Sequence, residues 1–419
     1  MNDAKGKFLM KSRRLLHLLS TLLLALMASN VVAKTTFSGI LQAGIINADD
    51  ETSFVEEGTG RLIHDESGLS LNQAFIVINS DITDNISAQI VANHTLTPES
   101  STGLTQAFLS YKPVPFMGYN WQVRGGMFYP SLSFENVDIG WTSPFAYTNS
   151  AINTWIGEEI RINGLELKLT RKGKHFNNSP HSFSGIAGIY TRNDTAGTIL
   201  AWRGFSLHDK QTQLNESLPF ANYPSIQVAP LDEQENHVEV FREEDGRPGY
   251  YLGAHWDYQR LSKVRYYYYD NQADPLDVSD GQYAWRTKFH SLSWLYRPIK
   301  NVRFIAQYLT GSTLMGPNAV HLDYEAFFIL SSYKSGKHRF TARIDKFGTY
   351  NKNDILPDDD NASNGKAFTI GWRYNIDKYW QVGAEWLGTK STQDSREQLG
   401  LDNDLDQSQW MAILQYRYK

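Results

Sequence analysis

The chain has 419 residues, a formal net charge of −5 at pH 7 and no cysteine, which excludes disulfide-stabilised scaffolds and cysteine-ligated metal or redox centres. Hydrophobic residues make up 41% of it and aromatic residues 13%, and no run after residue 33 is long and apolar enough for a membrane-spanning helix. A chain that is polar on average but rich in aromatic residues is typical of a sheet with one face in lipid and the other in water.

The N-terminal segment has the pattern of a cleaved export signal. A cluster of lysine and arginine residues precedes the apolar stretch 15–28, and Ala33 offers a small residue for cleavage. A membrane anchor is the alternative, but the apolar stretch is short for a span and is interrupted by polar residues such as His17. We therefore expect residues 1–33 to be a signal peptide and residues 34–419 to form a single domain.

Most of the remaining chain alternates apolar and polar residues with a period of two. In the stretch YWQVGAEWLG, for example, Trp380, Val382 and Trp386 share one face, and Gln381 and Glu385 share the other. Segments of about ten residues with this pattern cross a bilayer as tilted β-strands, and we identify about 17 of them. They start near Phe37, Leu69, Ile86, Leu104, Trp121, Ile160, His181, Ala196, Pro248, Ser262, Gln282, Val302, Leu322, Lys337, Lys366, Tyr379 and Gln409.

The number of strands is constrained by parity, because single-chain bacterial barrels have an even number. Short turns alternate regularly with long polar loops after about residue 250, so the miscount lies earlier in the chain. Either one early segment is not a strand, or a further strand lies within 210–247, where 237–241 is the candidate. We predict an all-β transmembrane antiparallel β-barrel of about 16 strands, with 18 as the alternative.

Four consecutive tyrosines in VRYYYYD, residues 264–270, fit such a wall. A strand that faces lipid on one side and water on the other accepts tyrosine on both, as part of an aromatic girdle outside and as a hydrogen-bonding group inside. Because arginine facing lipid costs about 2–4 kcal/mol at mid-bilayer, Arg265 is expected to point inward. Tyr267 and Tyr269 then point inward too, and Tyr266 and Tyr268 point outward.

The stretch 121–172 contains a long connection between two strands, and it carries bulky residues that include Trp141 and Trp155. Apolar surface of this size needs a partner, so the connection is either an extracellular loop packed on its neighbours or a loop folded into the lumen. We favour the second interpretation, in which the loop narrows the pore. The predicted pore constriction and selectivity residues are Arg124, Arg161, Glu158, Glu159, Trp141 and Trp155.

The order of the segment RGGMFYPSLSFENVD, a loop and the strand GEEIRINGLELKL resembles the phosphate-selective porin O/P family of Gram-negative outer-membrane proteins. In that family a strand ending in Gly-x-Phe-x-x-Pro leads through an inward-folded loop to a strand that contains arginine. The matching positions here are Gly126, Phe128 and, one residue early, Pro130. The resemblance implies a homotrimeric, passive diffusion channel of the cell outer membrane. The family's lysine-rich path for phosphate is not evident in this chain, so the likeness does not extend to phosphate selectivity.

The alternating pattern also predicts a set of inward-pointing arginines. One interpretation is a wall of salt bridges with inward acids such as Glu166, Asp345 and Glu385. The other is a cationic pore interior that prefers anions, because a low-dielectric wall focuses the field of unpaired charges. Besides Arg124 and Arg161, the predicted lumen-facing arginines are Arg203, Arg265, Arg286, Arg303, Arg339, Arg343, Arg373 and Arg417.

These patterns predict an outer-membrane porin that passes small hydrophilic solutes or ions by passive diffusion, with outer-membrane lipid and lipopolysaccharide around it. The chain shows no zinc-protease, phosphate-loop or nucleophile-elbow motif. We therefore expect no catalytic residue, metal, cofactor or nucleic-acid partner. The alternatives are a facilitator specific for a sugar or another small molecule, which saturable block of the current would indicate, or a barrel enzyme or receptor. The sequence leaves open the solute, the ion preference and the gating.

Overall fold

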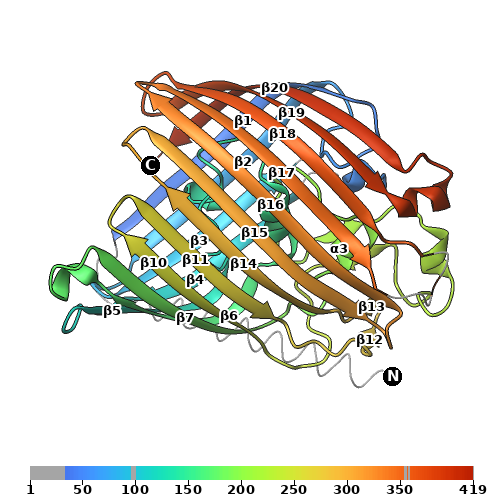
Figure 1. Cartoon of the computed structure of the whole chain (residues 1–419), viewed down its shortest axis with the longest axis horizontal. Coiled ribbons are helices and arrows are strands. Elements are labelled where there is room, and N and C mark those ends of the chain that lie inside the picture. Colours follow the sequence, from blue (N-terminus) through green and yellow to red (C-terminus); the bar gives the residue numbers. More distant parts are fainter. Residues whose placement is uncertain (1–33, 96–100, 353–355, 357–358, 419) are drawn as a thin grey trace.

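The computed structural model describes residues 34–95, 101–352, 356 and 359–418, so the predicted signal peptide lies outside the described residues. Sixteen antiparallel strands form one closed barrel, because β20 (Asp404–Tyr418) pairs with β1 (Lys34–Ala48) (Figure 1). Each strand pairs with its neighbour in the chain, apart from short strands that lie in the loops. Within these ranges, no helix reaches the length and apolarity that a transmembrane helix requires.

The barrel strands are long and tilted, as a bilayer-crossing wall requires. Between β1 and β20 the wall consists of β2 (Gly68–Asp81), β3 (Ile86–Thr95), β4 (Ser101–Tyr111), β5 (Tyr119–Phe128), β6 (Ile162–Arg171), β7 (His181–Thr191), β10 (Gly249–Tyr258), β11 (Ser262–Asp270), β14 (Arg286–Tyr296), β15 (Val302–Met315), β16 (Val320–Ser335), β17 (His338–Asn351), β18 (Ser363–Asn375) and β19 (Trp380–Gln393).

Short elements occupy the loops. They are β8 (Ser217–Pro219), β9 (His237–Glu239), β12 (Val278–Ser279), β13 (Gln282–Tyr283), the helices α2 (Ala151–Glu159) and α3 (Thr198–Trp202), and the 3-10 helices η1 (Phe54–Glu56), η2 (Ile139–Trp141), η3 (Gly173–His175), η4 (Pro224–Gln227) and η5 (Asp394–Leu399).

The prediction of 16 strands is confirmed, and the structure identifies the surplus segment. The stretch near Ala196 is not a wall strand, because it continues into α3, whose five residues are all buried and show no alternation. The candidate eighteenth strand, 237–241, is not in the wall either. Its first three residues form β9, which pairs only with β8 in a loop.

The wall has one apolar and one mixed face, as the period of two predicts. Along β14, exposed and buried residues alternate, with Leu292 and Trp294 outside. Along β11, Tyr266 is 41% exposed, whereas Tyr267 and Tyr269 are buried. The predicted orientation of the tyrosine run is therefore confirmed, and the exposed apolar band is the surface that a bilayer requires.

The two ends of the barrel differ. Short connections such as 259–261 and 336–337 join strands at the end where β1 starts and β20 finishes, on the left of Figure 1. The long connections lie at the other end. Short periplasmic turns and long extracellular loops are the usual arrangement in outer-membrane barrels, so we refer to the two ends by these names.

Candidate functional site

Two long loops fold into the barrel and fill much of its lumen. The first lumen loop, residues 129–161, connects β5 to β6 and carries α2, all nine of whose residues are buried. The second lumen loop, residues 192–248, connects β7 to β10 and carries α3. The inward fold of the first loop confirms the sequence prediction. The second loop was missed, because its acidic composition resembles that of a solvated loop.

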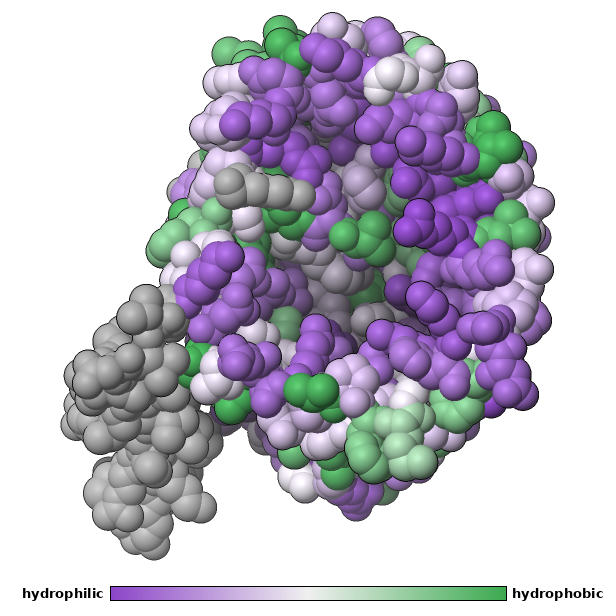
Figure 2. All heavy atoms as spheres, turned by 90° about the vertical axis from the view of Figure 1, so that its left-hand side faces the viewer, coloured by the Kyte–Doolittle hydropathy of each residue, from purple (hydrophilic) through white to green (hydrophobic). Residues whose placement is uncertain are grey.

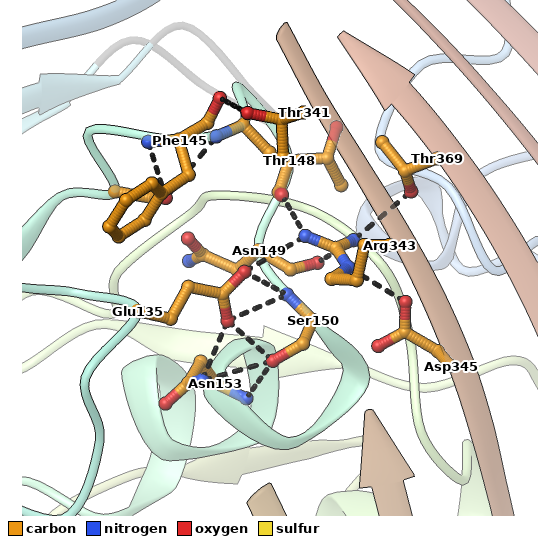
Figure 3. Close-up of polar contacts among 12 residues, drawn as sticks. Glu135, Phe145, Thr148, Asn149, Ser150, Asn153, Thr341, Arg343, Asp345 and Thr369 are labelled. Carbon is orange, nitrogen blue, oxygen red and sulfur yellow. Dashed lines mark hydrogen bonds and ion pairs between the residues drawn. The ribbon is translucent and has the colours of Figure 1, made fainter. Parts of the chain in front are cut away.

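Arg343 on β17 is the main anchor of the first lumen loop (Figure 3). Its guanidinium pairs with Glu135 of the loop (Nη1–Oε1 2.9 Å) and with Asp345 of the wall (Nε–Oδ2 2.7 Å). It also donates to the carbonyl oxygens of Thr148 (2.6 Å) and Asn149 (2.8 Å). All three charged side chains are at most 1% exposed, so each depends on these partners rather than on water.

Glu135 in turn organises the start of α2. It accepts hydrogen bonds from the Ser150 hydroxyl (2.6 Å) and from the Asn153 side-chain amide (2.7 Å). Ser150 is the N-cap of α2, and its hydroxyl oxygen accepts the Asn153 backbone N–H (3.3 Å). One buried carboxylate therefore links the helix N-terminus to the wall arginine (Figure 3).

Other inward charges hold the rest of the first lumen loop against the wall. Glu385 accepts the backbone N–H groups of Tyr147 (2.6 Å) and Thr148 (2.8 Å). Arg417 forms a two-pronged ion pair with Asp138 (2.7 and 2.6 Å). Arg265 donates to the Ser133 carbonyl (2.7 Å). Thus inward arginines and acids are present, as predicted, but they bind the loop more than they bind each other.

The two lumen loops are locked together through Glu158 and Glu159. Glu158 forms a bidentate pair with Arg203 of the second loop (2.7 and 2.5 Å) and contacts His208 (3.0 Å). Burial alone would raise the pKa of Glu158, but Arg203 and His208 lower it to about 2. Glu159 accepts the N–H groups of Gly197 (3.1 Å) and Ile199 (3.2 Å) at the start of α3.

Arg61, in the loop after β1, ties the second lumen loop to the extracellular rim. Its Nη1 donates to the carbonyl oxygens of Arg203 (2.7 Å) and Phe205 (2.9 Å), and the side chain is fully buried. Sequence reasoning missed Arg61, because it lies outside the alternating segments. Its only signal is an arginine amid a stretch that is otherwise acidic.

The predicted constriction residues separate into two groups. Arg124 and Trp141 line a cavity of about 410 Å³ in the periplasmic half of the lumen. Arg124 is paired with Glu166 (2.8 Å) and lies over the Phe128 ring. The others, which are Arg161, Trp155, Glu158 and Glu159, are at most 1% exposed and are enclosed between the two lumen loops.

Two of the predicted lumen-facing arginines need correction. Arg286 points outward. Its neighbour Thr287 is buried on the inner face of β14, and adjacent residues of a strand face opposite sides. Arg286 forms a long ion pair with Asp270 (3.6 Å). Arg203 lies in the lumen but not on a wall strand, since it caps α3. The alternation places the remaining ones on the inner face, namely Arg265, Arg303, Arg339, Arg343, Arg373 and Arg417.

Three polar cavities follow one another beside the two loops, along the inner face of the wall near β1 to β4 and β20. The cavity of about 410 Å³, the periplasmic vestibule, is followed by a small cavity of about 10 Å³ that shares Asp138 with it. A third cavity, of about 30 Å³, shares Gln73 with the second and is lined also by His64 and Asp209 near the extracellular end. Figure 2 shows the periplasmic end of the barrel, where hydrophilic residues surround a recess.

One group of carboxylates has a spacing suited to a metal ion. Oxygens of Asp194, Glu243 and Asp245, in the second lumen loop, lie within 4.8 Å of one another, as oxygen ligands of a hard cation do. Each of them already accepts a backbone N–H: Asp194 from Glu244 (2.7 Å), Glu243 from Arg192 (2.6 Å) and Asp245 from Arg247 (2.7 Å). The loop therefore satisfies one oxygen of each group by itself, whereas Oε1 of Glu243 is buried without a hydrogen-bond partner among the described residues.

The comparisons with known proteins support the fold. No protein-family model and no curated protein matches the sequence. Solved structures do match: the trimer form of the outer-membrane protein OmpT of Vibrio cholerae (10% identity, 92% of this chain and 99% of that chain, TM-score 0.53), the outer membrane channel DcaP of Acinetobacter baumannii (10%, 93% and 99%, 0.56) and an anion-selective porin from Comamonas acidovorans (9%, 92% and 100%, 0.51). The chain thus has the fold of the Gram-negative outer-membrane porins. The narrower likeness to the phosphate-selective O/P family stays a prediction.

Proposed function

We propose that the protein is a passive channel of the outer membrane for small hydrophilic solutes or ions, and that the state described here is a narrow one. The observation that carries the proposal is the series of polar cavities inside a closed barrel with an apolar exterior, and we infer a polar route through them. A sixteen-stranded barrel is wide enough for an aqueous lumen, and here two loops reduce it to cavities of about 30 and about 10 Å³. Cavities of this size hold single water molecules or small ions and exclude sugars in this state.

Single-channel recording in planar bilayers tests this proposal. We expect small, ohmic conductance steps that scale with salt concentration, because diffusion through a fixed polar route involves no saturable step. Steps that saturate with a sugar, or that a sugar blocks, would indicate the facilitator instead. A protein that folds, shows heat-modifiable migration and gives no steps would contradict the channel and favour a receptor or an enzyme.

Arg124 is expected to contribute to ion selectivity, whereas Arg161 is not. Arg124 lines the periplasmic vestibule, and Arg161 is 1% exposed, with its Nη1 donating to the Thr212 carbonyl (2.6 Å). Replacing Arg124 with glutamine removes a cation from the vestibule and leaves Glu166 uncompensated. The reversal potential in a salt gradient should therefore shift toward cation preference, because the vestibule loses a positive charge that attracts anions.

The matched control is Arg161→Gln, which should leave the reversal potential within error because its side chain does not line the route. An equal shift in both variants would contradict the assignment of the vestibule as the selective region. The anion preference that the inward arginines suggest is carried here by Arg124 and by Arg265, which also lines the vestibule.

Asp209 should make the ion selectivity depend on pH. It lines the cavity of about 30 Å³, and burial raises its pKa to about 7. The carboxyl is therefore neutral below neutral pH and charged above it. Three other titratable side chains line this cavity: burial lowers the pKa of His64 to about 4, Lys210 is paired with Glu216 (2.5 Å), and His94 is hydrogen-bonded to Thr102 (2.9 Å).

Cation preference should accordingly rise between about pH 6 and about pH 8, the interval in which a carboxyl of this pKa ionises. Because the pKa is raised from its ordinary value of 3.8 to about 7, this carboxyl destabilises the folded second loop progressively as the pH rises from about 3.8 to about 7, and its contribution is constant above that. Reversal potentials measured across the interval check the prediction. His94→Gln should keep the rise, and Asp209→Asn/His94→Gln should give a flat profile. A flat profile in the unaltered protein would contradict the prediction.

We also propose that the channel is a homotrimer in the outer membrane. The exterior around β1 to β3 exposes aliphatic residues such as Leu41, Ile45 and Ile76, whereas β18 to β20 expose aromatic rings such as Phe368 and Trp410. Aromatic girdles belong to lipid-facing surfaces, so the aliphatic side is the one suited to subunit contact. If native mass spectrometry in mild detergent gave the mass of a single chain with its barrel intact, the proposed trimer would be contradicted.

A further inference from the structure

The small cavity between the first lumen loop and the wall has an unusual lining. It measures about 10 Å³, which is room for the centre of one water-sized particle. Gln42 of β1 and Gln415 of β20 both line it, and they are directly opposite each other in the strand register. Arg373 of β18 and the Arg417–Asp138 ion pair complete its polar side.

Three buried polar atoms of this lining have no hydrogen-bond partner among the described residues, and all three are N–H donors. They are the side-chain amide nitrogens of Gln42 and Gln415, each side chain belonging to a residue that is 2% exposed, and Nε of Arg373, which is 5% exposed. Buried donors without an acceptor are costly, so such a set points to a species that accepts from all of them.

The charge of Arg373 is also uncompensated by any close carboxylate. Its other nitrogens donate to the carbonyl oxygens of Ser143 (3.2 Å) and Ala146 (2.5 Å), and its guanidinium lies 4.0 Å from the centre of the Tyr147 ring. No ion pair to Arg373 forms within the described part of the chain. Asp138 is engaged by Arg417, and the Glu385 carboxylate accepts two backbone N–H groups of the first lumen loop.

We propose that this cavity binds a single small anion of the halide class. A halide only accepts hydrogen bonds, and it would satisfy all three orphan donors and balance Arg373. A water molecule would bring two hydrogens of its own into a site whose unpartnered buried atoms are all donors, whereas a halide brings none. The size of the cavity excludes phosphate and carboxylates. The inference rests on the proposed channel, since the site lies on the polar route between the vestibule and the extracellular cavity.

Bromide replaces chloride and is visible by its anomalous X-ray scattering, so it serves as the probe. Crystals of the full protein grown in sodium bromide should show a bromide peak at this cavity, and titration of its occupancy gives an apparent affinity. The double variant Gln42→Leu/Gln415→Leu keeps the side-chain volume and removes two donors, which should weaken that affinity by at least about tenfold. The control Gln307→Leu changes a buried amide on the opposite wall and should leave the peak unchanged.

The absence of the peak in the unaltered protein would overturn the site, whatever the variants do. An equal peak in the double variant would also overturn it, because the donors would then not be the ligands. The experiments can reject the halide site and the channel independently of each other. Conductance without a bromide peak rejects the site and leaves the channel, whereas a bromide peak in a protein that gives no conductance steps rejects the channel and leaves the site.

Discussion

Replacing Arg343 with methionine should release the first lumen loop and open the pore. The substitution leaves Glu135 and Asp345 buried without their cation, and removing one partner of a buried ion pair usually costs about 3–5 kcal/mol. Carbonyl oxygens of Thr148 and Asn149 lose their donor as well. Because the wall is held by its own inter-strand hydrogen bonds, we expect the loop to leave before the barrel unfolds, with a several-fold rise in single-channel conductance.

Two further variants make this test specific. Arg339→Gln removes another inward arginine of β17, whose Nη1 donates to the Ser332 hydroxyl (2.9 Å) and which makes no ion pair in the described part of the chain. It should leave the conductance near its original value. The triple variant Arg343→Met/Glu135→Gln/Asp345→Asn removes the uncompensated charges and should recover part of the lost order. A higher single-channel conductance for Arg339→Gln than for Arg343→Met would contradict the claim that Arg343 is the main anchor of the first lumen loop.

Replacing Glu158 with leucine should free the second lumen loop while the first stays in place. Arg203 and His208 would then lose the carboxylate that holds them against α2. Leaving one buried charge without its partner again lowers stability by about 3–5 kcal/mol. We expect faster proteolysis within residues 192–248 and a conductance between those of the unaltered protein and the Arg343 variant.

The double variant Glu158→Leu/Arg203→Met distinguishes lost charge pairing from lost packing. Apolar replacement of a buried ion pair is often neutral or stabilising, so the double variant should restore protection of the second loop. Lys390→Gln, which breaks an exposed pair with Asp406 (2.6 Å), is the control and should change nothing measurable. Greater sensitivity to proteolysis in the double variant than in the single one would contradict the role of the pair.

The same pair predicts a response to acid. Because the pKa of Glu158 in the folded protein is about 2, below its ordinary value of 4.5, the carboxylate stabilises the interlock at every pH above 4.5. That contribution is lost progressively as the pH falls from 4.5 toward 2. The second lumen loop should therefore become sensitive to an acid protease in this interval, and the Glu158→Leu/Arg203→Met variant should not show the change.

The contacts between the wall and the first lumen loop change how the inward arginines are interpreted. A row of arginines inside a pore suggests a free cationic surface, but Arg265, Arg343, Arg373 and Arg417 all donate to the first lumen loop. Much of their hydrogen-bonding capacity is therefore used in holding the constriction. Ion selectivity then depends on the fewer charges that line the remaining cavities, which is why single substitutions there are expected to have measurable effects.

The sequence by itself determined the wall of this protein. A period of two requires one face in lipid and one in the lumen, and that requirement is local, so it located the strands and oriented the tyrosines of β11. Parity then limited the strand number. The bulky residues of the first lumen loop required burial, and a closed barrel offers burial only in its interior or against its rim.

The contents of the lumen depend on contacts between segments that are far apart in the chain. Arg343 and Glu135 are 208 residues apart in the chain, and the Tyr147 amide and Glu385 are 238 apart, so no local pattern joins them. The second lumen loop looks solvated in sequence, but in the fold its acids pair mostly with groups of the same loop, as Glu216 does with Lys210 and Asp194 with the Glu244 N–H. Likewise, the outward direction of Arg286 follows from the register of β14 against its neighbours. Partners of buried charges are set by which segments the closed wall brings together, and this depends on the whole fold.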